Sequence, residues 1–230
     1  MVVTIHQPEH LPWLGFCHKA TLADVFVLLD VVQFRKNYFQ NRNRILGPNG
    51  PMWLTVPVLL RGHTRKTIAE MEIHNGVPWS QKWWRSLRHA YGGAPYFDAH
   101  AAFFESVAAR RWTRLADLNV ALIEYLFDAL QVRCRLVRAS ALSVAGARSE
   151  LLLDICARLG ASAYLAGQHG RDYLDESLFD ARGIEVRYHA FAHPSYPQKH
   201  GGPFVSHLSV VDLLFQCGPN SSAILRGTAS

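Results

Sequence analysis

The first residues able to do proton chemistry lie at the ends of two apolar runs near the start of the chain. His6 follows the run VVTI, and Asp30 follows the run VFVLL. An imidazole titrates near neutral pH, so His6 is a candidate general base. A carboxylate at the end of a buried strand must be hydrogen-bonded, paired or exposed in a cleft, so Asp30 is a candidate acid. The alternatives are a structural histidine that hydrogen-bonds the loop at 8–12, and a carboxylate that anchors the following turn.

A metal site and a cofactor site are not favoured by the sequence. His6 and His10 are four residues apart, but Pro8 and Pro12 oppose the continuous helix that would bring their rings together. The four cysteines are far apart without a C-x-x-C pair, which favours reduced and mostly buried thiols. Neither a G-x-x-x-x-G-K-[ST] loop nor a G-x-G-x-x-G motif occurs. We therefore expect no metal and no cofactor.

A run of cations, carboxamides and aromatic residues, RKNYFQNRNR, follows Asp30 at residues 35–44. Such side chains offer several hydrogen-bond donors to a phosphate or carboxylate, and an arginine can donate two parallel bonds. Because loops beside a strand end often carry ligand contacts, we expect this run to bind an anion. The residues assigned to substrate binding are Lys36, Asn41, Arg42 and Asn43, together with Gln7 of the first loop. The alternative is a solvated connector.

The segment AGQHGRDYLDE (166–176) begins at the end of a further predicted strand. Gly167 and Gly170 lack side chains, so a ligand can approach the backbone amides closely. Gly167, Tyr173 and Asp175 are assigned to substrate binding. The alternative for Tyr173 and Asp175 is that they cap the next helix.

The segment HPSYPQKHGGPF (193–204) is a predicted loop, because it contains three prolines and two glycines. His193, Tyr196 and Gln198 are candidates to close over the substrate as a lid. The alternative is a rigid turn. A further candidate surface contains Trp83 and Trp84, which with nearby arginines resemble a stacking patch for bases or sugars, although adjacent helical tryptophans more often divide between core and surface.

The elements that must position these residues begin with a strand, helix, strand unit. Residues 2–6 and 25–30 are apolar without alternation, which is typical of parallel strands covered on both faces. A short helix fits between them at 15–23. A right-handed crossover brings both strand ends to one sheet edge, where open α/β sheets bind ligands. We therefore expect His6, Asp30 and the loop at 167–173 to surround one cavity.

The rest of the pattern alternates in the same way after a long helical stretch. Further strands are predicted at 52–59, where Pro57 suggests an edge or a bulge, and at 134–140, 162–167 and 185–191, the last near an edge; helices are predicted at 79–130, 149–159 with Ser149 as N-cap, and 206–218. The sequence predicts one α/β domain over residues 1–230, with a mainly parallel sheet flanked by helices. A helical insertion or subdomain is predicted at 75–132.

Composition limits the partners. A chain of 230 residues with 49% hydrophobic content can bury a large core. The formal net charge of +6 favours anionic partners such as nucleotides, phosphorylated sugars, coenzyme A, an acidic carrier protein or RNA. No run of five basic residues occurs, so we do not expect DNA binding. We also expect no membrane insertion and no signal peptide, and hence a cytoplasmic location.

Several segments together resemble one family. The segments HQPEHLPWLGFCHK, ADVFVLLDVVQFRKNYFQNRNRI and WLTVPV, and later YLAGQHGRDYLDESLF, FAHPSYPQ and LSVVDLLFQCG, resemble the WbqC-like family in order along nearly the whole chain. The resemblance implies a cytoplasmic protein of polysaccharide (O-antigen-like) or specialised-metabolite biosynthesis. It also implies acyl or aminoacyl modification of an amino sugar. The family more commonly has an aromatic residue in place of His10.

The leading hypothesis is therefore a transferase in which His6 or Asp30 removes a proton from an acceptor amine. Its donor would be an anionic small molecule or a carrier-bound group: a nucleotide sugar, an acyl donor or an aminoacyl donor, aminoacyl-tRNA among them. A competing hypothesis is nucleotidyl transfer, although HQPEH spaces its histidines one residue wider than H-x-G-H. The third is a non-catalytic binding or scaffold component of a biosynthetic complex.

Overall fold

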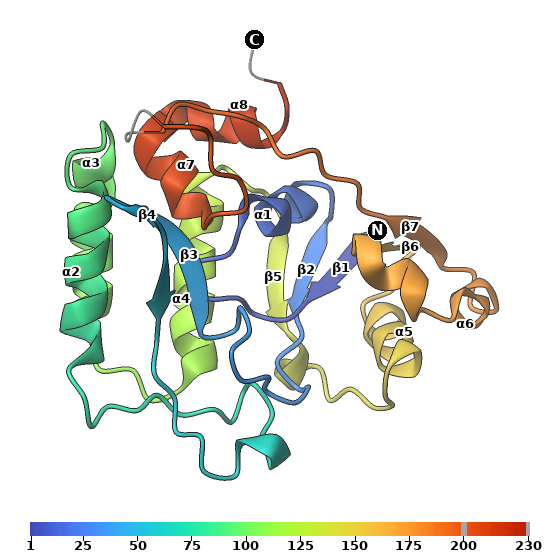
Figure 1. The fold of residues 1–230 in the computed structure, drawn as a ribbon. Coiled ribbons are helices and arrows are strands. Elements are labelled where there is room, and N and C mark those ends of the chain that lie inside the picture. Colours follow the sequence, from blue (N-terminus) through green and yellow to red (C-terminus); the bar gives the residue numbers. More distant parts are fainter. Residues whose placement is uncertain (199–201, 229–230) are drawn as a thin grey trace.

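A five-stranded parallel sheet forms the centre of the structure, a computed structural model that describes residues 1–198 and 202–228 (Figure 1). In spatial order the strands are β5 (Arg135–Arg138), β2 (Val25–Leu28), β1 (Val2–His6), β6 (Ala163–Ala166) and β7 (Glu185–Tyr188). Each neighbouring pair is parallel. The predicted α/β class is thus confirmed, and β7 lies at an edge as predicted.

Alternate side chains of the strands face two separate cores. Phe26 and Leu28 point to a large cluster that includes side chains of α1 (Leu14–Thr21) and α4 (Leu115–Ala129). Val25 and Val27 point to the opposite face, which is covered by α5 (Ser149–Arg158) and α6 (Glu176–Asp180). Because both faces of the sheet are covered, the central strands β1, β2 and β6 need no polar alternation, which explains their apolar sequences; the edge strands β5 and β7 contain charged residues and are partly exposed.

The order of the strands reverses between β1 and β6. The chain passes from β1 to β2 on one side, and after β5 it crosses to β6 and β7 on the other side. The β1–β6 ladder ends at Thr4 and Leu165, whereas β1 still pairs with β2 through His6. The last residues of β1 therefore have no β6 neighbour, and the sheet is open at its carboxyl edge at this position. In open α/β sheets this reversal point is the usual ligand site.

The strand predicted at 52–59 is present, but it begins and ends earlier and does not belong to the parallel sheet. Strand β4 (Gly50–Thr55) pairs antiparallel with β3 (Arg42–Gly47), and this hairpin is a sheet of its own. Strand β4 ends before Pro57, which has no amide hydrogen to donate to a ladder. Strand β3 was not predicted from the sequence. It begins within the cation-rich run, whose polar residues, asparagine above all, are uncommon in strands.

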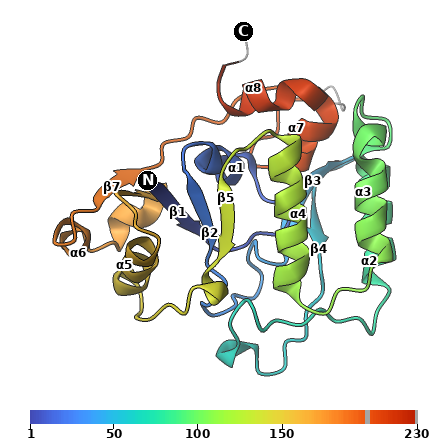
Figure 2. The ribbon, with the colours of Figure 1, turned by 180° about the vertical axis from the view of Figure 1, so that it is seen from behind.

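The helical stretch is present as three helices, α2 (Trp79–Tyr91), α3 (Phe97–Ala109) and α4. Figures 1 and 2 show α2 and α3 at the end of the molecule opposite to α5 and α6. Their buried side chains join the same cluster as one face of the sheet, so these helices share its core. No helix within the described residues is long and apolar enough to cross a membrane.

Two predicted helix starts differ from the structure. The N-cap of α5 is Arg148, and Ser149 is its first helical residue. The Ser149 hydroxyl instead accepts a hydrogen bond from the Asp175 amide at 3.0 Å, so it joins α5 to the segment before α6. Helix α7 (Val210–Cys217) starts later than predicted, with Ser209 as its N-cap, and the short α8 (Ser221–Leu225) follows.

Candidate functional site

His6 ends β1 at the reversal point and presents one free ring nitrogen. Its Nδ1 lies 3.0 Å from the Gln7 carbonyl oxygen, which can only accept, so Nδ1 carries the proton. Nε2 then has the lone pair, and no hydrogen bond to it occurs within the described residues. The side chain is 32% exposed, so a solute can reach it. Burial, followed by the charge of Lys19, lowers the pKa of His6 to about 4. The ring is therefore neutral at physiological pH.

Lys19 places a buried amine at the carboxyl end of β1. Its side chain comes from α1, is 3% exposed, and donates from Nζ to the Ile5 carbonyl oxygen at 3.0 Å. That carbonyl belongs to the part of β1 that lacks a β6 neighbour. Burial lowers the pKa of Lys19 to about 7, so much of this amine is uncharged at neutral pH.

Glu9 places a buried carboxyl beside His6. Its Oε1 lies 4.0 Å from His6 Nδ1, and its Oε2 is buried without a hydrogen-bond partner among the described residues. Burial raises the pKa of Glu9 to about 8, although a backbone hydrogen bond at Trp13 opposes the rise. Glu9 is therefore a protonated acid at neutral pH, next to a neutral base.

A histidine pair connects α1 to the residue that follows β7. His18 Nδ1 of α1 lies 2.8 Å from Nε2 of His189, which follows β7. Burial lowers the pKa of both rings, and that of His189 reaches about 4. His189 and Lys19 also act electrostatically on His6, so the ends of β1 and β7 and helix α1 share one group of titratable side chains.

Sequence reasoning missed Glu9, Lys19, His18 and His189. The available signal was Lys19, which lies three residues after the buried Phe16 and next to the buried Ala20, on the inner side of a short helix. A lysine at such a position is rarely buried without a functional reason. The histidine pair had no local signal, because its members are 171 residues apart in the chain.

His10 has a structural position. It has no exposed surface, its Nε2 accepts from the Trp83 indole at 2.9 Å, and its Nδ1 lies 3.1 Å from Asn119 Oδ1. An indole only donates, so the proton of His10 is on Nδ1. Asn119 in turn donates to the Gln40 carbonyl at 2.7 Å. This chain of bonds fixes the first loop to α2 and α4 and leaves His10 no nitrogen for a substrate.

Asp30 lies at the predicted sheet edge but is directed toward β5. Its carboxylate, 1% exposed, accepts from Arg138 Nε at 2.8 Å and from the Ser140 amide and hydroxyl at 2.9 and 2.8 Å. Arg138 also contacts Asp117. With these partners filled, the geometry favours the anchoring alternative over proton transfer. His6 and Asp30 share the edge but not a set of contacts.

The residues of the cation-rich run separate into buried and exposed positions. Asn41 donates to the Val56 carbonyl, and Asn43 donates to the Leu11 carbonyl, so both carboxamides hold the hairpin in place. Lys36 is exposed, and the Arg42 guanidinium lies 4.2 Å from the centre of the Trp53 ring. Anion binding by Lys36 and Arg42 stays a prediction.

Gln7 connects the first loop to this run. Gln40 Nε2 donates to Gln7 Oε1 at 2.7 Å, and Gln40 Oε1 accepts from the Arg35 amide at 2.8 Å. The run therefore starts next to the loop that carries His6 and Glu9.

In the loop after β6 there is room for a side chain at Gly167 but not at Gly170. A Cβ on Gly167 would meet nothing within 4 Å, whereas one on Gly170 would lie 3.2 Å from the Tyr188 ring. Gly170 thus serves packing. Asp175 caps α6 by accepting from the Ser177 amide, as the alternative expected. Tyr173 is 62% exposed.

The lid candidates are held within the protein. Gln198 donates to the Val205 carbonyl oxygen and accepts from the Val205 amide. It also donates to Asp212 Oδ2 at 2.8 Å. Tyr196 is buried beside Asp212, which contributes to raising its pKa. His193 Nε2 accepts from the His207 amide at 3.2 Å. These contacts favour the rigid-turn alternative for 193–198; residues 199–201 of the predicted loop lie outside the described residues.

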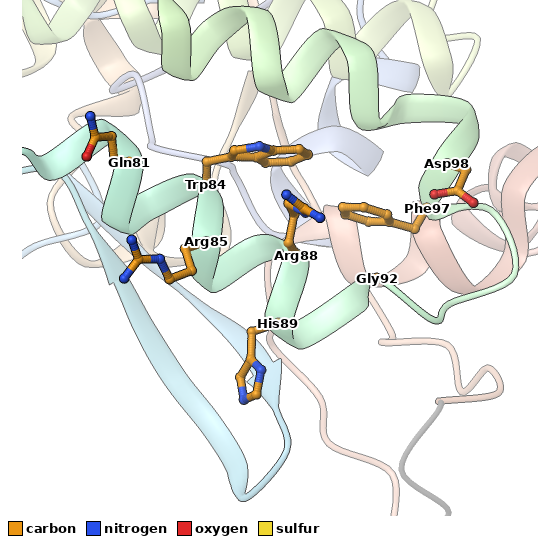
Figure 3. A pocket seen from close by; sticks show the side chains of 8 residues that line it. All are labelled: Gln81, Trp84, Arg85, Arg88, His89, Gly92, Phe97 and Asp98. Carbon is orange, nitrogen blue, oxygen red and sulfur yellow. The ribbon is translucent and has the colours of Figure 1, made fainter.

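The tryptophan patch lies elsewhere. Trp83 is buried against His10, whereas Trp84 lines a groove of about 610 Å³ between α2 and the start of α3, so the pair divides between core and surface (Figure 3). Figure 3 shows Arg88 beside Trp84 and Phe97, with Arg85 and His89 pointing away from them. The groove shares none of its residues with the group around His6.

Within residues 1–198 and 202–228, no three His, Cys, Asp or Glu side chains are grouped as a metal site requires. The cysteines are free, and three of the four are buried, as predicted. The side chains of His6, Glu9 and Lys19 provide a neutral imidazole, a protonated carboxyl and a partly neutral amine. Such a set is suited to proton transfer.

These features define a doubly wound α/β protein whose titratable residues gather at the strand-order reversal. The chain belongs to the WbqC-like protein family, whose sequence pattern matches residues 7–224. A similar protein, the uncharacterized protein Rv1507c of Mycobacterium tuberculosis (strain ATCC 25618 / H37Rv), is 31% identical over 226 residues, which cover 97% of each chain. No solved structure matches the chain.

Proposed function

We propose that this protein transfers an acyl or aminoacyl group from an activated donor to an amine, such as that of an amino sugar, in polysaccharide or specialised-metabolite biosynthesis. The observation that carries the proposal is His6, a neutral base whose side chain is 32% exposed and whose Nε2 has no hydrogen-bond partner within the described residues, beside the protonated Glu9. Amide formation requires removal of a proton from the amine and delivery of a proton to the leaving group.

Each group has one role in the proposed step. The amine nitrogen attacks the carbonyl carbon of the donor, a C–N bond forms, and the bond from that carbon to the carrier oxygen or sulfur breaks. His6 Nε2 takes the proton of the amine. The leaving oxygen or sulfur takes the proton of Glu9.

The pair is then restored by proton exchange with water. The protonated His6 ring gives the proton on Nε2 to water and keeps the one on Nδ1, which faces the Gln7 carbonyl, and the Glu9 carboxylate takes a proton from water. Lys19 acts on this cycle through its charge, because it lowers the pKa of His6 and so keeps the base neutral.

The test is incorporation of a labelled acyl or aminoacyl group into amino-sugar acceptors, with nucleotide-linked, thioester and RNA-ester donors compared. We expect transfer with one donor class and a loss of about a hundredfold or more in the variant His6→Gln. The matched control is His89→Gln, an exposed histidine on α2, which should keep full activity.

Two results would oppose the proposal. Full activity of His6→Gln would show that His6 is not the base. Saturable binding of donors without transfer would favour the non-catalytic scaffold alternative.

A further inference from the structure

The positive charge of the chain is concentrated in one segment. Residues 31–69 contain seven of the 24 Lys and Arg residues and none of the 18 Asp and Glu residues. This segment alone has a formal charge of +7, more than the +6 of the whole chain. A local excess of this size attracts polyanions more strongly than the net charge suggests.

The two loops of this segment form one surface. Gln33 Nε2 donates to the Thr64 carbonyl at 2.9 Å, and the Phe34 amide donates to the Lys66 carbonyl at 3.1 Å. Figure 1 shows the loop after β2 and the loop after β4 side by side at the bottom of the molecule, and Figure 2 agrees. Lys66 is paired with Glu72 at 3.6 Å, so its charge is partly used within the protein.

Exposed aromatic rings lie among these cations. Tyr38 is 40% exposed and Trp53 is 45% exposed, although burial would be favourable for both rings. The Arg35 guanidinium lies 4.9 Å from the Tyr38 ring centre, and Arg42 lies 4.2 Å from that of Trp53. Phe39 contacts both rings. Proteins that bind single-stranded nucleic acid use this combination, with cations for phosphates and rings for stacked bases.

The surface is continuous with the candidate site. Gln40 joins Arg35 to Gln7, one residue after His6. Tyr173, from the loop after β6, has a 62% exposed side chain, and the pKa of its hydroxyl is raised first by partial burial, then by Asp172 and by Tyr38. A polymer bound here would thus end beside the open edge between β1 and β6.

We propose that residues 31–69 and Tyr173, here called the basic face, bind an unpaired stretch of RNA whose terminal ribose presents the transferred group to His6. This inference rests on the proposed function for the transfer itself. An acidic carrier protein would also meet the charge, but it offers carboxylates and no array of bases for Tyr38, Trp53 and Tyr173. The rings therefore favour RNA.

The experiment measures fluorescence anisotropy of a short labelled single-stranded RNA with the whole protein. A duplex of the same sequence and a polyglutamate peptide serve as competing probes. We expect the single strand to bind best, with an affinity that falls as salt rises, at a log–log slope of about −0.7 for each phosphate contacted. Tyr38→Ala and Trp53→Ala should each weaken binding by about fivefold or more, the effect of losing one stacked base.

The control is Arg133→Gln, an exposed arginine that precedes β5 at the amino edge of the sheet, which should not change the affinity. Tyr38 lies in an exposed loop, so its variant tests stacking even if Trp53→Ala disturbs the hairpin. Equal competition by polyglutamate, unchanged affinity in Tyr38→Ala, or absence of RNA binding would each overturn the inference.

Binding requires no turnover, so the two proposals fail separately. RNA binding by the basic face without transfer from any donor would count against the proposed function alone. Transfer from a small donor without RNA binding would support the proposed function and would rule out RNA as the carrier of the transferred group.

Discussion

Three residues at the carboxyl end of β1 have pKa values far from those of the free side chains. The pKa of Glu9 is raised to about 8, that of Lys19 is lowered to about 7, and that of His6 is lowered to about 4. Burial is the first cause in all three, because a low-dielectric setting penalises the charged form. Residues with such shifts are concentrated in active sites, so this group is the strongest functional signal of the described chain.

The pH dependence of transfer should follow these residues. Glu9 must be protonated and His6 neutral, so kcat/KM should fall above about pH 8 and below about pH 4. Glu9→Gln should remove the upper limb. Lys19→Met should move the lower limb to higher pH, because the charge that lowers the pKa of His6 is gone. Rate profiles of the three proteins check this, and unchanged limbs in both variants would oppose the assignments.

Asp30→Asn should lower stability more than activity. The substitution breaks a buried, hydrogen-bonded ion pair with Arg138, for which a loss of about 3 kcal/mol in the free energy of unfolding is reasonable. Denaturant titration measures this loss. Asp117→Asn is the control, since this 49%-exposed partner of Arg138 should contribute no more than about 1 kcal/mol. If Asp30→Asn instead keeps its stability and loses turnover about a hundredfold, the acid role expected from the sequence is correct.

At the scale of elements, α1 depends on the close approach of one ring. A Cβ on Gly15 would lie 2.2 Å from the Trp13 indole, which itself contacts Phe191 and His207. Gly15→Ala should therefore displace Trp13 and loosen the connection between the first loop and the segment after β7. We expect a loss of about 1–3 kcal/mol despite the better helix propensity of alanine. Tryptophan fluorescence and thermal unfolding report the change.

Gly167→Ala provides the matched comparison. The added Cβ meets open space, and the backbone φ of −68° suits alanine, so stability should not fall. If the substrate approaches the Gly167 amide as the sequence suggested, KM should rise in this variant while Tm stays the same. An equal loss of Tm in both glycine variants would contradict the packing argument.

The central strands β1, β2 and β6 were predictable because they are buried on both faces and therefore have continuous apolar sequences. Strand β3 was not predicted, because its residues Arg42, Asn43 and Arg44 form a polar run, and the position of Asn43 is set by a hydrogen bond to the distant Leu11 carbonyl. The position of His6 at the carboxyl edge of the sheet was also predictable. The direction of Asp30 was not, since Arg138 is 108 residues away in the chain.

At the scale of the whole molecule, the buried histidines should make the fold sensitive to acid. The pKa values of His6, His10 and His189 are all lowered to about 4, first by burial. Between about pH 4 and pH 6.5 the unfolded chain binds more protons at these rings than the folded chain does. Stability should therefore rise with pH through this window, and His10 alone contributes about 1.4 kcal/mol per pH unit at its steepest.

Glu9 opposes this trend with one group, because its raised pKa means that the folded state holds the extra proton between about pH 4.5 and 8. Below about pH 6.5 the three histidines together change the free energy of unfolding by more than Glu9 does. Denaturant midpoints measured from pH 7 down to pH 5 should fall, and His10→Gln should have a shallower dependence in spite of its lower stability. A flat profile in the parent protein would show that the rings remain hydrated.

The β3–β4 hairpin pairs with itself and, within the described residues, shares no ladder with the five-stranded sheet. Substitutions on its outer face therefore do not change the register of β1, which sets the position of His6. In evolutionary terms, the proposed recognition surface and the proposed proton chemistry lie on parts of the scaffold that can change separately. Exchange of one segment would then alter the carrier and leave the residues at the sheet edge intact.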